Sequence, residues 1–325
     1  MAKTHITLDF IKEFSKQQDL ESVAGVFCAC TQLLEDAIDK VSAKNVILIP
    51  RQNVFLNVYG PFQYGSNTMS SDIDILISVQ SPQLQLNSQK MIKSRFELLK
   101  QRFVDAWNNN KSKRKKKKKL RKQKKKQELN LLKNRAEKPY DLSDFKDDLA
   151  DEIVKLLPST CIIYNNINDI RVVAQRELGA NFNIKIAIKS DDATKLYDYN
   201  HNTFIKYDFD YVSQNIKKQI ELHGNNFIKL FRILNSLYYS LYRKQPPIFL
   251  VESLLLKMAQ TEIFSGKNET KLYLTFINYV NLITPYKLIY SSDIYQYVSD
   301  KKMAAALANH IKEFLIKLIK MAEKF

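Results

Sequence analysis

Apolar residues recur with two different periods along this chain, and the period changes at identifiable places. In four stretches of the first half an apolar residue occurs every three or four positions, which indicates amphipathic helices. In the longest of them, Phe27, Cys30, Leu34 and Ile38 form one apolar face. The predicted helices are Leu8–Gln17, Leu20–Ala43, Gln89–Trp107 and Leu142–Leu157.

Strand patterns lie between these helices. The run Val54–Tyr59 is rich in strand-forming residues and ends at Gly60, and a second strand opens at Asp72 after a short polar loop. Two further strands are predicted at Asp169–Gln175 and Asn181–Lys189, and the second of these alternates apolar and polar residues. Such alternation is typical of a strand that buries one face.

From Tyr211 onward only helical patterns occur. A segment of strands and helices followed by helices alone predicts an α+β protein with two lobes and a cleft between them. We expect residues 1–210 to form the sheet lobe with its flanking helices, and residues 211–325 to form an all-α lobe. The helices predicted there are Tyr211–His223, Asn226–Tyr242, Ile248–Gln260, Lys271–Leu282 and Met303–Phe325.

The stretch Val58–Val79 carries the candidate chemistry. Residues two apart in a strand point to the same face, so Asp72 and Asp74 present two carboxylates on one side while Ile73 and Ile75 face the other. Carboxylates held this close repel each other unless a divalent cation lies between them. The pattern therefore predicts a Mg²⁺ site that handles nucleotide phosphates. The alternative is a solvated strand end with two acidic residues by chance.

The positive charge is concentrated in one segment. The chain has 325 residues and a formal net charge of +17. Lys111–Lys126 contains 13 Lys or Arg and no acidic residue, so subtracting it from +17 leaves only +4 for the rest. We expect an exposed insertion at about residues 108–128 that binds RNA through its phosphates. The alternative is a low-complexity insertion without a specific partner, because no aromatic residues are interleaved to stack bases.

The remaining composition is that of a globular protein, with 45% hydrophobic and 26% charged residues. The three cysteines have no metal-ligand spacing, and the apolar runs are shorter than a membrane span. These observations predict a cytoplasmic protein in a reducing compartment with no membrane association. They do not indicate an oligomeric state.

The order of these motifs resembles the DNA-polymerase-β-type nucleotidyltransferase superfamily, which includes poly(A) polymerases, oligoadenylate synthetases and bacterial enzymes related to cyclic GMP-AMP synthase. The family pattern is a strand, Gly-Ser, roughly ten residues and then Asp-hydrophobic-Asp-hydrophobic, with a third carboxylate on a later strand. Here Gly60-Pro61 precedes Phe62–Ser71 and then Asp72-Ile73-Asp74-Ile75. The segment Asn225–Leu254 resembles the family's helical signature, a basic helix, a proline and a Leu-x-Glu helix.

The resemblance implies a mixed-sheet fold and a role for each matching residue. Asp72 and Asp74 would be the catalytic residues and would hold two Mg²⁺ (or Mn²⁺) ions with a nucleoside triphosphate, most simply ATP. Asn183 stands where the third carboxylate is expected and would be a metal ligand through its amide oxygen. The residues expected to contact the triphosphate are Gly60, Gly65 and Ser66, through backbone N–H groups, and Arg232, through its charge.

Several positions depart from the family pattern. Pro61 replaces the serine, Asn183 replaces the aspartate, and Asn235 and Ile248 replace the expected lysine and small hydroxyl residue. The alternatives for the third carboxylate are Asp169, which opens the neighbouring strand, and Asp191-Asp192, just beyond Lys189.

Two functions therefore stay open. The first is a template-independent nucleotidyltransferase that transfers a nucleoside monophosphate, most simply AMP from ATP, to RNA or another acceptor. The second is a catalytically impaired relative that binds a nucleotide, RNA or a protein partner. The Asp72 and Asp74 pair favours the enzyme, and we adopt it as the working hypothesis.

Overall fold

The computed structural model describes residues 20–66, 72–85, 87, 140–166, 169–174, 176–190, 193–198, 203–259, 264, 269–283 and 288–322. Three predicted segments lie outside the described residues: the helices Leu8–Gln17 and Gln89–Trp107, and the lysine-rich segment Lys111–Lys126.

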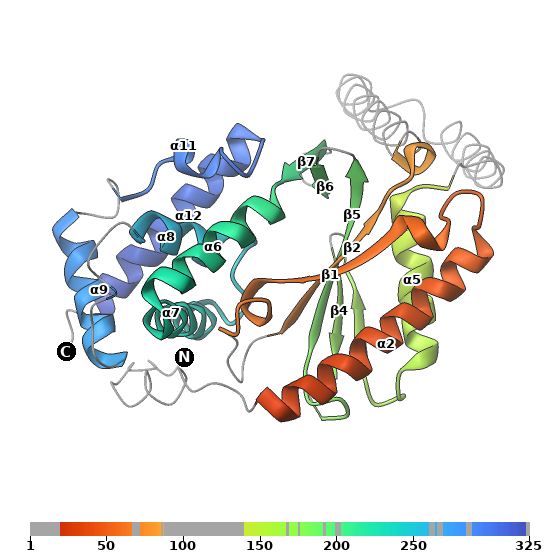
Figure 1. Cartoon of the computed structure of the whole chain (residues 1–325), viewed down its shortest axis with the longest axis horizontal. Helices are drawn as coiled ribbons and strands as arrows, with labels where there is room; N and C mark the ends of the chain where they lie inside the picture. Colours follow the sequence, from red (N-terminus) through yellow and green to blue (C-terminus); the bar gives the residue numbers. More distant parts are fainter. Residues whose placement is uncertain are drawn as a thin grey trace, which may run out of the picture.

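A seven-stranded sheet forms the middle of the molecule (Figure 1). Its strand order is β1-β2-β5-β4-β3, and a hairpin of β6 and β7 extends from the far half of β5. The pair β2 and β5 is parallel and the other pairs are antiparallel, so the sheet is mixed, as expected. The strands are β1 (Val54–Tyr59), β2 (Ile73–Val79), β3 (Ile162–Asn165), β4 (Asp169–Val173), β5 (Phe182–Ser190), β6 (Ala193–Asp198) and β7 (Thr203–Tyr207).

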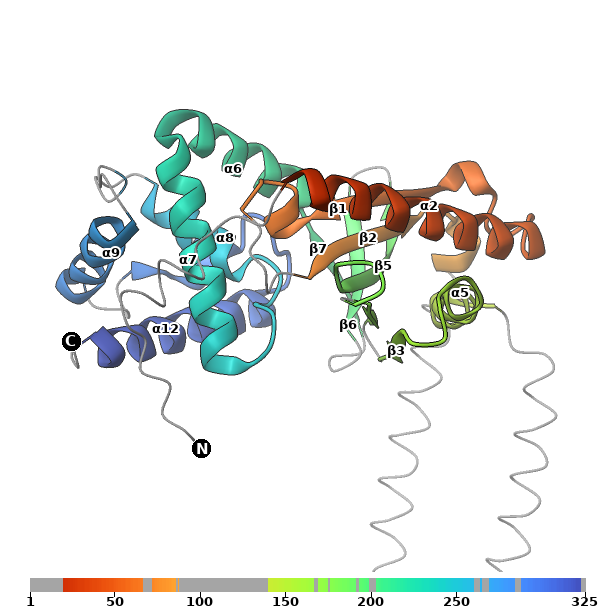
Figure 2. The same cartoon turned by 90° about the horizontal axis from the view of Figure 1, so that it is seen from below.

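Two helices, α2 (Leu20–Lys44) and α5 (Leu142–Leu156), lie side by side on one face of the sheet (Figure 2). Their apolar stripes pack against the buried faces of β2, β4 and β5. Helix α5 begins at Asp141, whose side chain accepts hydrogen bonds from the backbone N–H groups of Ser143 and Asp144, a capping box. The predicted apolar face of the first of these helices is confirmed, because Cys30, Leu34 and Ile38 are buried.

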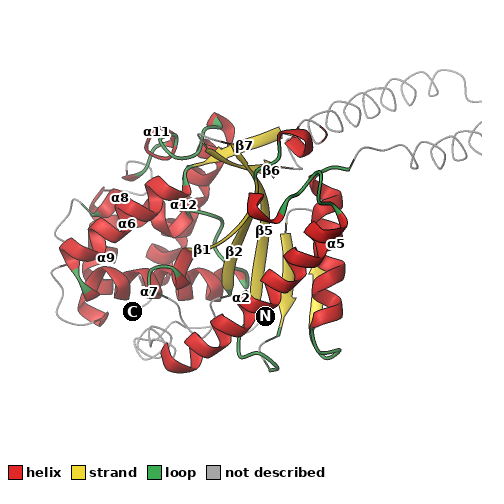
Figure 3. Cartoon of the chain, turned by 45° about the vertical axis from the view of Figure 1, so that its right-hand side comes forward, coloured by secondary structure: helices red, strands yellow, loops and turns green. Residues whose placement is uncertain are grey.

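A helical lobe packs against the other face at one end of the sheet (Figures 1 and 3). Its apolar core continues into the sheet through Leu76, Ala187 and Leu196. The α+β prediction, a mixed sheet with flanking helices followed by helices alone, is thus confirmed. The helices are α6 (Phe209–His223), α7 (Asn225–Tyr242), α8 (Leu250–Met258), α9 (Glu269–Ile283), α11 (Ser291–Ile294) and α12 (Lys301–Ala322).

The turn that follows β1 is docked on the helical lobe. This turn begins with a short 3-10 helix, Gly60–Phe62 (a second one, Arg51–Asn53, precedes β1). Gln63 Nε2 donates a hydrogen bond to Ser213 Oγ at 3.0 Å, and the ring of Tyr64 lies 5.8 Å from that of Phe231. The turn is therefore held from both lobes, which fixes the position of the strand ends beneath it.

Three strands were not predicted from the sequence. In β3 the side chains of Ile162 and Tyr164 are half exposed, so this edge strand lacks the alternation that marks a buried face. Hairpin β6–β7 is defined by its pairing with β5 rather than by its own pattern. No helix in the described part of the chain is both long and apolar enough to cross a membrane.

Candidate active site

A cleft of about 320 Å³ lies between the sheet and the helical lobe. The strand ends of β1, β2, β4 and β5 form its floor, and α7, α8 and the connection Lys244–Phe249 between them form the opposite wall. The cleft that the sequence predicts between two lobes is therefore present. Polar and charged side chains gather on its floor, beside the apolar residues Tyr59 and Phe249.

Asp72 and Asp74 both line this cleft. Asp74 lies in β2, where its neighbours in register are Tyr59 of β1 and Asn183 of β5. Asp72 lies one residue before β2, so the strand begins one residue later than the pattern predicts. The isoleucines that alternate with them, Ile73 and Ile75, are buried on the opposite face against α2 and α5. The expected separation of carboxylates and isoleucines between the two faces is thus observed.

Asn183 lies directly beside Asp74. Its Nδ2 donates a hydrogen bond to Asp74 Oδ1 at 3.0 Å. The strand position preferred for a third carboxylate thus does adjoin Asp74, and it carries a neutral amide. Asp169 of β4, one of the alternatives, also lines the cleft, but its neighbour in register is Lys185. The other, Asp191-Asp192, lies outside the described residues.

Two cations on the cleft floor were not singled out from the sequence. An Arg171 guanidinium nitrogen, Nη2, lies 3.2 Å from Asp72 Oδ2, and Lys185 Nζ lies 3.7 Å from Asp169 Oδ2. Arg171 follows Asp169 by two positions and Lys185 follows Asn183 by two, so each shares a face with a cleft residue. This i, i+2 spacing is the sequence signal that could have found both.

Burial governs the titration of the carboxyl groups in the cleft. Burial raises the pKa of Asp74 to about 7, although the nearby Lys185 charge and the Asn183 hydrogen bond act against this. Burial also raises the pKa of Asp72, against the opposing influence of the Arg171 charge. A carboxylate is destabilised in this way when desolvation exceeds its compensation by partners.

A further carboxyl group faces the cleft from the helical lobe. Glu252, in α8, is only 7% exposed, and it belongs to the Leu-x-Glu helix of the family's helical signature. Burial, together with the charge of Asp74, raises the pKa of Glu252 to about 7. The cleft therefore holds two carboxyl groups that titrate near neutrality without a basic partner in direct contact among the described residues.

Gly60 allows the turn after β1 to approach Asp74. Its φ is +70°, a region that L-residues with a side chain rarely adopt, and a Cβ atom there would lie 3.0 Å from Asp74 Oδ2. Pro61 follows as the first residues of the 3-10 helix form. The glycine is thus required both by the backbone conformation and by the carboxylate beside it.

Gly65, Ser66 and Arg232, which were expected to contact the triphosphate, lie in and beside the turn that follows β1. The N–H and the hydroxyl of buried Ser66 both donate to the Pro61 carbonyl oxygen, at 2.9 and 3.2 Å. The N–H of Gly65 donates to the Phe62 carbonyl, and its own carbonyl accepts a hydrogen bond of 2.6 Å from Arg232 Nη2. These groups close the turn and fasten it to α7, and none of the three residues lines the cleft. The N–H groups of Gly65 and Ser66 are thus used within the turn itself, and Arg232 joins that turn to α7 through its Nη2.

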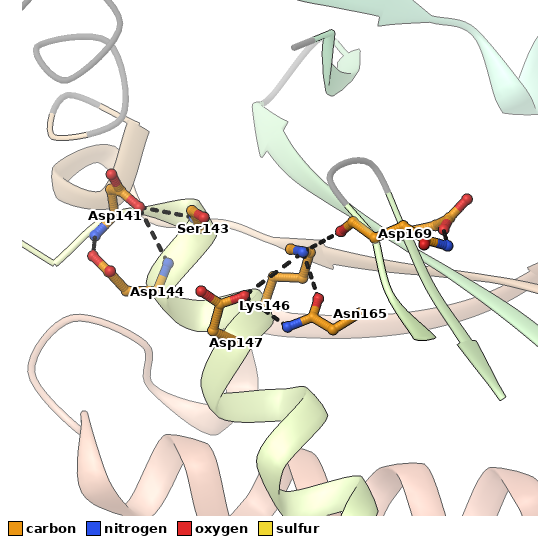
Figure 4. A network of polar contacts seen from close by, with 8 residues as sticks. Asp141, Ser143, Asp144, Lys146, Asp147, Asn165 and Asp169 are labelled. Atoms are coloured by element: carbon orange, nitrogen blue, oxygen red, sulfur yellow. Dashed lines mark hydrogen bonds and ion pairs between the residues drawn. The ribbon is translucent and has the colours of Figure 1, made fainter. Parts of the chain in front are cut away.

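The turn between β3 and β4 is anchored by Lys146, a buried side chain of α5 (Figure 4). Lys146 Nζ donates to Asn165 Oδ1 at 2.5 Å and to the Asn166 carbonyl oxygen. Asn166 Nδ2 in turn donates to Asp169 Oδ1 at 2.7 Å. Burial lowers the pKa of Lys146, partly offset by the charge of Asp147. This chain of contacts fixes the end of β4 on which Asp169 and Arg171 are placed.

The residues of the cleft fit one divalent cation. Asp72 and Asp74 offer hard oxygen ligands on one face, and a cation bound there would favour the ionised form of both buried carboxyl groups. Asn183 could add an amide oxygen. Within the described residues, no group of three or more His, Cys, Asp or Glu side chains is placed to hold a metal ion.

No protein-family model and no curated protein matches this sequence. Solved structures of low sequence identity do resemble the fold. CdnC of E. coli MS115-1, in a structure with ATP, is 14% identical with a TM-score of 0.49, and the match covers 86% of this chain and 73% of that chain. STING-associated CdnE c-di-GMP synthase from Capnocytophaga granulosa is 14% identical with a TM-score of 0.46, over 97% of this chain and 89% of that chain.

A third similar structure is Vibrio cholerae DncV cyclic AMP-GMP synthase in complex with nonhydrolyzable GTP. It is 12% identical with a TM-score of 0.41, over 86% of this chain and 70% of that chain. Two of these three structures are thus named as a c-di-GMP synthase and a cyclic AMP-GMP synthase. TM-scores below 0.5 leave its function to be derived from the residues of the cleft.

Proposed function

We propose that the cleft binds a nucleoside triphosphate with a divalent cation and that the chain transfers the nucleotidyl group to an acceptor hydroxyl. One observation carries this proposal. Asp72 and Asp74 lie on the cleft face of the sheet, beside Asn183 in register and under a helical lobe. A carboxylate pair of this kind is the protein's part of a metal-assisted phosphoryl transfer site.

The acidic and basic side chains of the cleft would have different roles in this reaction. Asp72 and Asp74 would hold the cation, which supplies neutralising charge to the triphosphate and lowers the pKa of the acceptor hydroxyl. Lys185, Arg171 and Lys244 bring positive charge to the same cleft and would contact phosphate oxygens.

The test is incubation of the protein with each of the four labelled nucleoside triphosphates and Mg²⁺ or Mn²⁺, with and without RNA. Release of pyrophosphate together with a labelled product supports transfer. The double variant Asp72→Asn/Asp74→Asn should lose the product. The matched control, Asp36→Asn/Asp210→Asn, changes two exposed aspartates on α2 and α6 and should retain it.

A second candidate function is nucleotide binding without transfer. It is favoured by the amide of Asn183 at the third ligand position and by the ion pair that Arg171 makes with Asp72. Metal-dependent binding of a nucleotide without pyrophosphate release from any of the four would establish it. Absence of binding in the presence of Mg²⁺ or Mn²⁺ would exclude both candidates.

We also propose that the transferred group is AMP from ATP in the simplest form of the reaction, and that RNA is one acceptor. Deletion of Lys111–Lys126 tests the RNA arm, because it should reduce the salt dependence of RNA binding. We propose a cytoplasmic location as well. The three cysteines, Cys28, Cys30 and Cys161, are free thiols, as a reducing compartment would keep them.

A further inference from the structure

The side chain of Lys185 is an unusual feature of the cleft floor. Lys185 lies in β5 two residues after Asn183, so both side chains point to the same face of the sheet. The Lys185 side chain is only 17% exposed. It lies 3.7 Å from Asp169, and its charge also reaches Asp74, the other carboxylate of that floor. A mostly buried ammonium group thus lies beside Asp169 and within electrostatic reach of Asp74.

Two of the four carboxyl groups in the cleft form ion pairs with basic side chains. Asp72 is paired with Arg171, and Asp169 is paired with Lys185. Asp74 and Glu252 have no such partner among the described residues, so a divalent cation beside Asp74 would meet carboxyl groups that no basic side chain of the cleft has paired.

The neutral side chain of Asn183 also bears on how many cations the cleft can hold. A carboxylate at its position would add a negative charge beside Asp74, and a second cation could then be held between the strands. The chain instead has a neutral amide there, with an ammonium group two residues further along the same face. A second divalent cation near Lys185 would meet like charge in a partly desolvated cleft, where such repulsion is strong.

We infer that this cleft takes a single divalent cation with each nucleotide, and that the ammonium group of Lys185 supplies the charge a second cation would bring. This inference rests on the proposed function, because it requires that a nucleotide binds in the cleft. Lys185 would contact the phosphates directly, and Arg171 would hold Asp72 in place for the one cation.

Equilibrium dialysis against Mn²⁺ and a non-hydrolysable ATP analogue tests the inference on the full chain. The excess of each solute in the protein chamber measures both bound Mn²⁺ and bound nucleotide. We expect a ratio of one Mn²⁺ per nucleotide for the native chain. We expect two for the double variant Asn183→Asp/Lys185→Met, which restores the carboxylate and removes the ammonium.

Three further variants separate charge from folding. Lys185→Arg keeps the positive charge and should keep a ratio of one. Lys185→Met alone should weaken nucleotide binding at least tenfold and also keep a ratio of one, because Asn183 still lacks a charge. The matched control is Lys195→Met in β6, which removes a lysine of the same sheet outside the cleft and should change neither quantity.

The possible outcomes are distinct. A ratio of two in the native chain overturns the inference and leaves the proposed function standing. A ratio of one in both the native chain and the double variant overturns the assignment of the exclusion to Lys185 and Asn183. If the native chain binds no nucleotide, the proposed function fails and the inference fails with it.

Discussion

Glu252 offers the sharpest test of how this cleft is built. The change Glu252→Gln keeps the shape of the side chain and removes its ability to ionise. Glu252 is 7% exposed, and its pKa is raised from 4.5 to about 7, chiefly by burial and further by the charge of Asp74. The ionised form is therefore less stable in the folded protein than in the unfolded chain.

The sign of the effect follows from proton binding. Between pH 4.5 and about 7 the folded protein holds a proton on Glu252 that the unfolded chain has lost. Stability therefore falls as the pH rises through this range and then levels off. A pKa raised from 4.5 to about 7 corresponds to a loss of about 3 kcal/mol above pH 7. Glutamine imitates the protonated acid, so the variant avoids this loss.

The assay is urea unfolding followed by far-UV circular dichroism, at about pH 5 and about pH 8. We expect the native chain and Glu252→Gln to differ by less than about 1 kcal/mol at the lower pH, and the variant to be about 2 to 3 kcal/mol more stable at the higher pH. The matched control Glu221→Gln, an exposed position on α6, should show the same small difference at both. Equal effects of Glu252→Gln at the two pH values would refute the assignment of a buried, unpaired carboxyl group.

The remaining predictions concern the groups that shape the cleft. Gly60→Ala should destabilise the fold by about 1–3 kcal/mol and weaken nucleotide binding, because the new Cβ requires an unfavourable φ and clashes with Asp74 Oδ2. The control Gly25→Ala, in a helix with open space around it, should be neutral or stabilising in the same urea titration. Arg232→Met should free the carbonyl of Gly65 and raise the KM for the nucleotide without changing the Mn²⁺ ratio, and an unchanged KM would contradict the fastening role of this side chain. Lys146→Met should cost about 1–3 kcal/mol in thermal or urea unfolding, because the buried ammonium group of Lys146 no longer donates to Asn165 Oδ1 and to the Asn166 carbonyl oxygen. A loss below about 0.5 kcal/mol would show that the turn it anchors is held by other contacts.

Much of the fold could be predicted from local pattern. The helical period of α2, the alternation in β5 and the switch to helices alone near residue 210 each reflect a buried face, and a buried face leaves its period in the sequence. The strands that were missed have no such face of their own. In β3 both Ile162 and Tyr164 are half exposed, so only the pairing with β4 defines the strand.

Some residues of the candidate site could likewise be predicted from local pattern, and others are placed only by long-range contacts. Asp72 and Asp74 were found because their spacing of two places both carboxylates on one face of a strand, a local property. Asn183 was placed beside Asp74 only by the parallel register of β2 and β5, and that register depends on contacts between residues about a hundred positions apart. Glu252 belongs to a motif visible in the sequence, but its position over Asp74 requires both lobes.

Local patterns predict four of the strands, the change to helices alone near residue 210 and the carboxylate pair on β2. Contacts between strands, and between the sheet and the helices that follow it, fix which polar groups meet at that pair. They turn Ser66 and Arg232 inward to hold a turn, and they bring Arg171 and Lys185 onto the floor of the cleft. The physical reason is that periodicity records whether a residue is buried, whereas the charge balance of a cleft depends on distances across strands and lobes that no local pattern contains.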